Sequence, residues 1–120
     1  MSTCASFGFV AAACLAGSAA LADFAKVNDR SEFVALISDR TLTRPLINLT
    51  VTPDGRIEGM GARWEVTGNW SWQDGYFCRD LFWGGDEIGY NCQEVKVNGT
   101  RMRFTSDKGS GMSAVFKLKD

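Results

Sequence analysis

The chain has 120 residues, with 13 basic and 14 acidic side chains and a formal net charge of −1. The charges are mixed along residues 23–120, without a basic block or an acidic tail, so nothing indicates a nucleic acid or an anionic membrane as a partner. The chain contains no histidine, which excludes Ser-His-Asp and Cys-His catalysis and any histidine-bound metal.

Residues 1–22 form an apolar segment without a charged side chain, and Ala20-Leu21-Ala22 matches the A-x-A pattern of signal-peptide cleavage sites. We therefore predict a signal peptide cleaved after Ala22, a periplasmic or secreted protein, and a single domain over residues 23–120. No Lys or Arg precedes the apolar run, and its length approaches the ~20 residues that span a bilayer. An uncleaved membrane anchor is therefore the alternative.

Two cysteines follow the apolar segment, Cys78 and Cys92. In an exported protein such a pair predicts a disulfide, which closes a loop of about 15 residues and contributes roughly 3 kcal/mol. A metal site with two cysteines is the competing interpretation, but it needs further ligands. We expect neither a metal nor a cofactor.

One short helix is predicted near the start of the domain, over residues 29–38. Asp29-Arg30-Ser31-Glu32 fits a capping box at its beginning. Apolar residues then recur at helical spacing, namely Phe33, Leu36 and Ile37.

Beyond this helix the period of the pattern changes to two, which is typical of β-strands. Apolar and polar residues alternate over residues 47–52, most clearly over 64–73, and again over 112–118, with turn residues such as Pro53-Asp54-Gly55 between the runs. We predict a mainly β fold of six to eight strands, a small antiparallel meander barrel or curled sandwich whose helix plugs one end or covers an edge. An open sheet backed by the helix is the alternative.

The strand register follows from the turns. If Asn98-Gly99 forms a two-residue type I′ loop, Val97 faces Thr100, Val95 faces Met102, Gln93 faces Phe104, and Glu94 faces Arg103 on the outside. The inner face is then the one that carries the apolar residues of the two strands, Val95, Val97, Met102 and Phe104.

A disulfide between directly opposed positions extends this register to the preceding strand, with a turn at residues 84–86. Arg79 then faces Asn91, Asp80 faces Tyr90, and Phe82 faces Ile88. Alternation directs Arg79 inward together with its neighbours two and four residues away, Phe77, Leu81 and Trp83. It leaves Cys78 and Asp80 outside.

An inward arginine needs a partner, because burying an unpaired charge costs several kcal/mol. One interpretation is a ligand site in the barrel lumen, where Arg79, Asn91 and Gln93 receive an anionic or hydrogen-bonding ligand. Three tryptophans would frame it: Trp70, Trp72 and Trp83. The other interpretation is a structural arginine that pairs with a backbone carbonyl or with a carboxylate such as Glu58 or Asp107.

Four segments resemble a group of short exported bacterial proteins of uncharacterised function: LxVxPDGRIxG from Leu49, TGxWxWxDGYFCRD from Thr67, NCQ from Asn91, and Arg103-Phe104. Some members of this group carry the label dihydrodipicolinate reductase. Enzymes of that name bind a nicotinamide cofactor on a βαβ domain and use a His-His motif, whereas this chain is short and has no histidine.

More distant resemblances run to lipocalin-like and avidin-like barrels, through Gly68-Asn69-Trp70, and to periplasmic lysozyme inhibitors, through Ser110-Gly111. The sequence thus favours an exported, monomeric, non-enzymatic barrel that binds a small molecule or a cell-envelope component. The alternatives are the reductase and a protein-binding module, such as a lysozyme-type hydrolase inhibitor, that acts through residues 84–87 or 107–111.

Overall fold

The computed structural model of the protein describes residues 23–120. The predicted signal peptide and the alternative membrane anchor fall in residues 1–22, outside the described residues, and both stay predictions. Within residues 23–120, no helix has the length and apolar character needed to cross a membrane.

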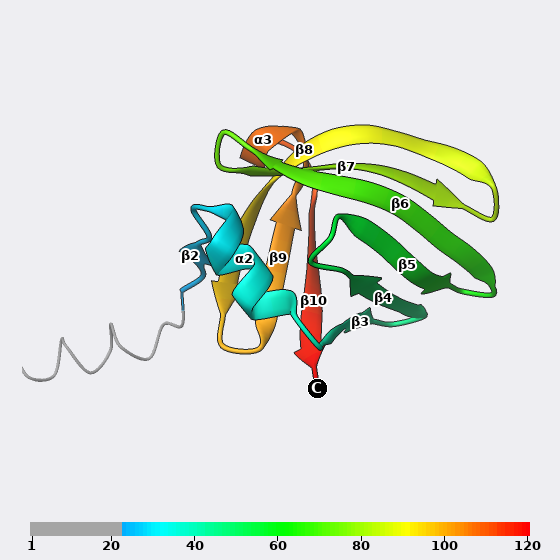
Figure 1. Ribbon diagram of the computed structural model, residues 1–120, viewed down its shortest axis with the longest axis horizontal. Helices are drawn as coiled ribbons and strands as arrows, with labels where there is room; N and C mark the ends of the chain where they lie inside the picture. Colours follow the sequence, from blue (N-terminus) through cyan, green and yellow to red (C-terminus); the bar gives the residue numbers. More distant parts are fainter. Residues whose placement is uncertain (1–22) are drawn as a thin grey trace, which may run out of the picture.

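The described residues fold mainly into antiparallel β-structure (Figure 1). In chain order the elements are β2 (Ala25–Lys26), α2 (Arg30–Ile37), β3 (Thr41–Arg44), β4 (Ile47–Val51), β5 (Arg56–Gly61), β6 (Trp64–Gln73), β7 (Tyr76–Trp83), β8 (Asp86–Asn98), β9 (Arg101–Thr105), α3 (Ser106–Gly109) and β10 (Ser113–Lys119). Each strand from β3 to β10 pairs with the next, and β10 pairs back onto β3. The predicted small barrel is therefore confirmed as a closed, eight-stranded antiparallel barrel, and the open sheet is wrong.

The predicted helix is confirmed as α2, and its first turn is capped by a side chain. The carboxylate of Asp29 accepts hydrogen bonds of 2.9 Å from the Glu32 N–H and the Ser31 hydroxyl. Glu32 in turn accepts from the Asn28 N–H, one residue before the N-cap. These hydrogen bonds, first of all the one from the Glu32 N–H, hold the pKa of Asp29 below its ordinary value.

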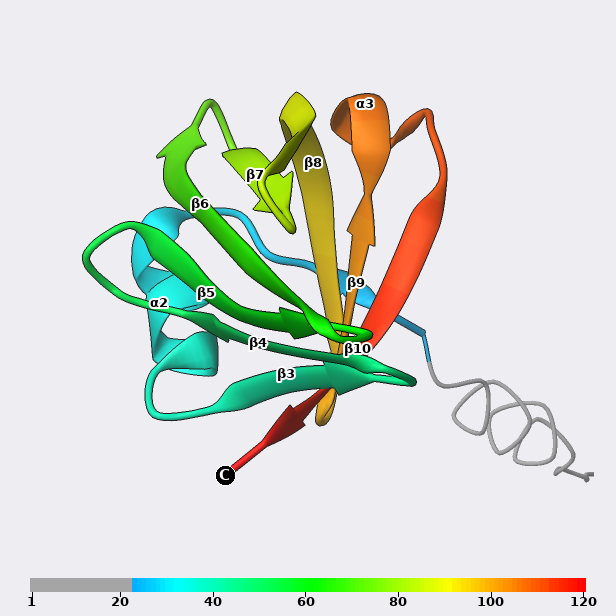
Figure 2. The same cartoon turned by 90° about the vertical axis from the view of Figure 1, so that its right-hand side faces the viewer.

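Helix α2 closes one end of the barrel. Its residues Phe33 and Ile37 are buried, and Phe33 lies 5.1–5.2 Å, between ring centroids, from Trp70, Trp72 and Phe77. Figure 2 looks into the barrel from the other end, with α2 behind the strands. We refer to the rings that meet at this end as the aromatic cluster: Phe33, Trp70, Trp72, Phe77, Phe104 and Phe116.

The β8–β9 turn differs from the prediction. Asn98 pairs with Arg101, so the loop is Gly99-Thr100, and Val95 faces Phe104 rather than Met102. Gly99 at the first loop position has a φ of +63° and Thr100 does not have a positive φ, the pattern of a type II′ rather than a type I′ turn.

The same offset overturns the predicted pair of Glu94 and Arg103, because Glu94 faces Thr105 and Arg103 faces Lys96. The offset moves every partner by two residues and so preserves the faces of the strands. Val95, Met102 and Phe104 are buried inside the barrel, as expected.

The β7–β8 hairpin follows the predicted register as far as its bulge. Cys78 faces Cys92 and is joined to it by a disulfide, Arg79 faces Asn91, and Asp80 faces Tyr90. Beyond Leu81, which faces Gly89, the register shifts, and Phe82 faces Glu87 instead of Ile88. A β-bulge at Ile88 therefore separates the disulfide from the hairpin tip.

Alternation on β7 sends Phe77, Arg79 and Leu81 inward, where all three line the same cavity. Cys78 lies on the outer face but is buried, between Ser71 of β6 and Cys92 of β8. The disulfide rules out the alternative metal site at the two cysteines.

Candidate functional site

Between the aromatic cluster and the opposite end of the barrel lies a cavity of about 400 Å³. We call it the central cavity. Its walls come from seven strands, mostly from alternate positions, from α3 and from the segment that follows α3. The lining residues are Leu42, Arg44, Leu49, Val51, Ile57, Phe77, Arg79, Leu81, Gln93, Phe104, Ser106, Met112, Ser113, Ala114 and Phe116.

The barrel wall is incomplete beside this cavity. Strand β10 pairs with β3 only over Lys117–Lys119, whereas its first half, from Ser113 to Phe116, pairs with β9 alone. Met112, directly before β10, lines the cavity and is 85 % exposed. The cavity therefore reaches solvent where β10 separates from β3.

Arg79 is held at the boundary between the central cavity and the outside. It lines the cavity and also a shallower depression on the outer surface, beside α3. Its Nη1 donates a hydrogen bond of 2.8 Å to the carbonyl oxygen of Gly89. A structural arginine is expected to pair with a backbone carbonyl or with a carboxylate, and the observed partner is the backbone carbonyl. Neither Glu58 nor Asp107 forms an ion pair with Arg79 in the described residues.

The β-bulge in β8 positions the Gly89 carbonyl that accepts the hydrogen bond from Arg79. Gly89 follows the unpaired Ile88 and has a φ of +110°, a conformation that side chains other than glycine rarely adopt. Burial lowers the pKa of Arg79, and the neighbouring carboxylate of Asp80 opposes this shift. A guanidinium stays charged under such a shift, so Arg79 brings a positive charge to the cavity.

Gln93 also lines the central cavity, opposite Phe77 of the aromatic cluster. Its side chain is buried and donates a hydrogen bond of 3.2 Å from Nε2 to the Ser106 hydroxyl at the start of α3. Arg79 and Gln93, which the sequence places on one face, are thus brought together on one cavity wall.

Asn91 does not line the central cavity. It lies on the outer depression, where its Nδ2 donates to Asp107 Oδ1 (2.8 Å) and its Oδ1 accepts from the Asp107 N–H (3.0 Å). Asp107 and Lys108 both have left-handed backbone conformations, so the paired contact with Asn91 holds α3 in a strained turn beside the cavity.

None of the three predicted tryptophans lines the central cavity. Trp70 and Trp72 pack on Phe33 at the α2 end, and the Trp70 indole N–H donates to the Thr52 carbonyl (2.9 Å). The Trp72 indole nitrogen is buried without a hydrogen-bond partner among the described residues. Trp83 lies at the other end, where its indole N–H donates to the Gly61 carbonyl (2.8 Å). Alternation assigns a residue to the inner face but does not give its height along the barrel.

Arg44 is a cavity residue that the sequence interpretation missed. It ends β3, two residues after the buried Leu42, and its guanidinium carbon lies 5.6 Å from the ring centroid of Phe116. The same alternation that identified Arg79 would have found it, because Leu42 and Arg44 occupy one face of a short strand.

Comparison of the chain with protein-family models, curated proteins and solved structures returned no significant match. Within residues 23–120 no group of three or more potential metal-binding side chains occurs. The central cavity and its two arginines are therefore the candidate functional site.

Proposed function

We propose that this protein is an exported, non-enzymatic β-barrel that binds a small molecule with an apolar body and an acidic group in its central cavity. The observation that carries the proposal is the lining of the cavity. Its walls are mostly apolar, and its only charged members are Arg44 and Arg79, since no carboxylate is among the described residues that line it.

The size of the cavity fits a metabolite-sized ligand. Its volume of about 400 Å³ lies within the range of roughly 300–1,000 Å³ that is usual for small-molecule sites. The aliphatic walls, among them Leu49, Ile57 and Leu81, would gain about 0.8 kcal/mol for each ligand methylene that leaves water.

Arg79 supplies the recognition of the acidic group. A guanidinium carries five N–H donors, and only the donation to Gly89 is formed with a described residue. The remaining donors suit a carboxylate or a similar anion, which accepts short, charge-assisted hydrogen bonds. Arg44, at the end of β3, adds a second positive charge to the same cavity.

Export and a non-enzymatic role complete the proposal. The Cys78–Cys92 disulfide is compatible with an oxidising, extracytoplasmic compartment. Residues 23–120 form a β-barrel without a βαβ unit, so this part of the chain gives no support to a nicotinamide-dependent reductase.

Isothermal titration calorimetry with matched ligands tests the proposal. We expect octanoate to bind and 1-octanol, which has the same chain without the charge, to bind more weakly. Arg79→Met should weaken octanoate binding about tenfold or more, because a charge-assisted hydrogen bond is lost. Arg101→Met, which removes an exposed charge from the beginning of β9, is the matched control and should bind as the wild type does.

The absence of heat with every member of a series of alkyl and aryl acids would contradict the proposed function. Equal affinities of the wild type and Arg79→Met would contradict the role of the arginine.

A further inference from the structure

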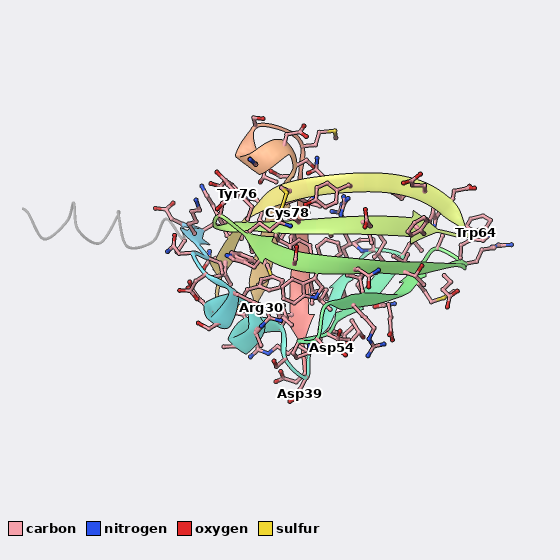
Figure 3. The ribbon with its side chains drawn as sticks, turned by 45° about the horizontal axis from the view of Figure 1, so that its top comes forward. Arg30, Asp39, Asp54, Trp64, Tyr76 and Cys78 are labelled. Atoms are coloured by element: carbon pink, nitrogen blue, oxygen red, sulfur yellow. A yellow bond between two sulfur atoms is a disulfide. The ribbon has the colours of Figure 1, made fainter. Side chains whose placement is uncertain are left out.

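Three hairpin turns meet at the barrel end opposite α2, and two exposed tryptophans lie there. The turns join β3 to β4, β5 to β6, and β7 to β8; Ala62 donates its N–H to the Leu46 carbonyl, and Gly84 to that of Glu65. Trp64 begins β6 and is 50 % exposed, and Trp83 ends β7 and is 41 % exposed. Figure 3 shows Trp64 at the end of the molecule that is remote from Arg30 on α2.

The two indole rings are fixed at a right angle. Their centroids lie 5.4 Å apart and their planes make an angle of 85°. The Trp83 N–H is held by the Gly61 carbonyl at 2.8 Å. Two glycines leave room for the rings, because an added Cβ would lie 3.0 Å from the Trp83 indole nitrogen at Gly61 and 3.1 Å from the Trp64 ring at Gly84.

A carboxylate borders the groove that these rings form. The groove is lined by Trp64, Trp83, Gly84 and Asp86. Asp86 forms no ion pair with any residue of the described part of the chain. The groove thus combines two aromatic faces with one free negative charge.

Four other aromatic rings already face basic side chains. Lys26 lies over Tyr76, Arg30 over Trp70, Arg44 over Phe116, and Arg103 over Phe24, at 4.4–5.6 Å from the ring centroids. Within residues 23–120, no basic side chain lies over Trp64 or Trp83. These two rings therefore have faces available for a cation from outside the described chain.

We propose that Trp64, Trp83 and Asp86 form a second binding site, for a quaternary ammonium group. The face of an indole carries negative electrostatic potential and attracts a cation within about 6 Å. A trimethylammonium group has no N–H to donate, so aromatic faces and a carboxylate recognise it, whereas a primary ammonium prefers water and hydrogen-bond acceptors. Perpendicular rings offer two such faces to one group.

NMR titration of the full chain distinguishes charge recognition from apolar contact. The probe is choline, and its control is 3,3-dimethylbutan-1-ol, which replaces the ammonium nitrogen by carbon and keeps the shape. We expect choline to shift the indole N–H signals of Trp64 and Trp83 along a saturating curve, while those of Trp70 and Trp72 stay in place. The neutral alcohol should bind about tenfold more weakly or not at all.

Single substitutions test which residues form the choline site. Trp64→Leu should weaken choline binding about tenfold, and Asp86→Asn severalfold, because one aromatic face or the counter-charge is lost. The matched control Tyr90→Leu removes an exposed ring from the outer face of β8 and should bind choline as the wild type does.

Shifts that grow linearly without saturation, equal binding of the neutral alcohol, or unchanged binding by both Trp64→Leu and Asp86→Asn would each overturn the proposal. Phosphatidylcholine vesicles identify the source of the group. When choline binds, retention of the protein on the vesicles assigns the site to lipid headgroups, and lack of retention assigns it to soluble quaternary amines; either result supports the site.

Discussion

The two halves of the barrel interior are built by the same alternation but filled differently. At the α2 end the inward residues are rings, and Phe33 enters from the helix to contact Trp70, Trp72 and Phe77. Toward the other end the inward residues are aliphatic side chains and arginines, which enclose the central cavity of about 400 Å³.

This difference separates the part of the barrel that stabilises the fold from the part that is open to a ligand. Phe77, Phe104 and Phe116 belong to both, because they pack in the aromatic cluster and also line the cavity. A substitution at the α2 end should therefore lower mainly the stability of the fold. A substitution in the central cavity should change mainly the binding of a ligand.

The largest expected effect is the loss of Phe33. Phe33→Ala should lower the free energy of unfolding by about 3–5 kcal/mol, because it leaves a hole among tightly packed rings. Leu49→Ala, on the cavity wall, is the matched control and should cost about 2 kcal/mol, the low end for such a change, because its side chain already borders empty space. Urea denaturation measures both, and equal losses would show that the cavity half is packed as tightly as the α2 end.

The disulfide should have the next largest effect. It joins β7 to β8 one residue from Arg79, where the two halves meet. Replacement of both Cys78 and Cys92 by Ser should cost about 3 kcal/mol, which lowers the Tm by several degrees or more. Non-reducing mass spectrometry of the wild type should find the two cysteines linked, and free thiols there, or an unchanged Tm in the variant, would contradict this prediction.

The inward-facing residues could largely be predicted from the sequence. The alternation of apolar and polar residues determines which side chains point into the barrel, even where the predicted strand register is wrong. The predicted β8–β9 loop lies one residue before the observed loop, yet Val95 and Met102 are buried as expected. Asn98-Gly99 suits a type I′ turn, but glycine also suits the first position of a type II′ turn, and the dipeptide does not decide between them.

Three features of the site could not be predicted. The bulge at Ile88 is a local insertion that leaves no periodic signal, although the neighbouring Gly89 is compatible with it. The height of Trp83 along the barrel depends on strand tilt rather than on alternation. Whether the inward face encloses a cavity depends on the combined volume of residues from seven strands, which no single strand pattern contains.

Filling the interior tests the same contrast by adding volume instead of removing it. Ala114→Phe extends into the central cavity and should change the free energy of unfolding by less than about 1 kcal/mol, while it abolishes octanoate binding. Val95→Phe, at a fully buried position of β8, should cost about 1–3 kcal/mol or more through overpacking. A large loss of stability in Ala114→Phe would mean that the cavity does not accept a ring.

The smallest expected effect concerns the cap of α2 and its dependence on pH. The folded-state pKa of Asp29 lies below its ordinary value, so the carboxylate stabilises the native state at pH values above the unfolded-state pKa. This contribution is lost as the pH falls through the lower, folded-state pKa. Asp29→Asn keeps a good capping residue but removes the titration, so its urea midpoint should decline less than that of the wild type between about pH 6 and about pH 3.

Because Asp29 anchors only α2, acid should loosen the aromatic cluster before it affects the disulfide region, and hydrogen exchange of the α2 amides should accelerate first. Parallel pH profiles of the wild type and Asp29→Asn would show instead that the cap contributes nothing to the pH dependence. The loss of stability in acid would then come from titrating groups other than Asp29.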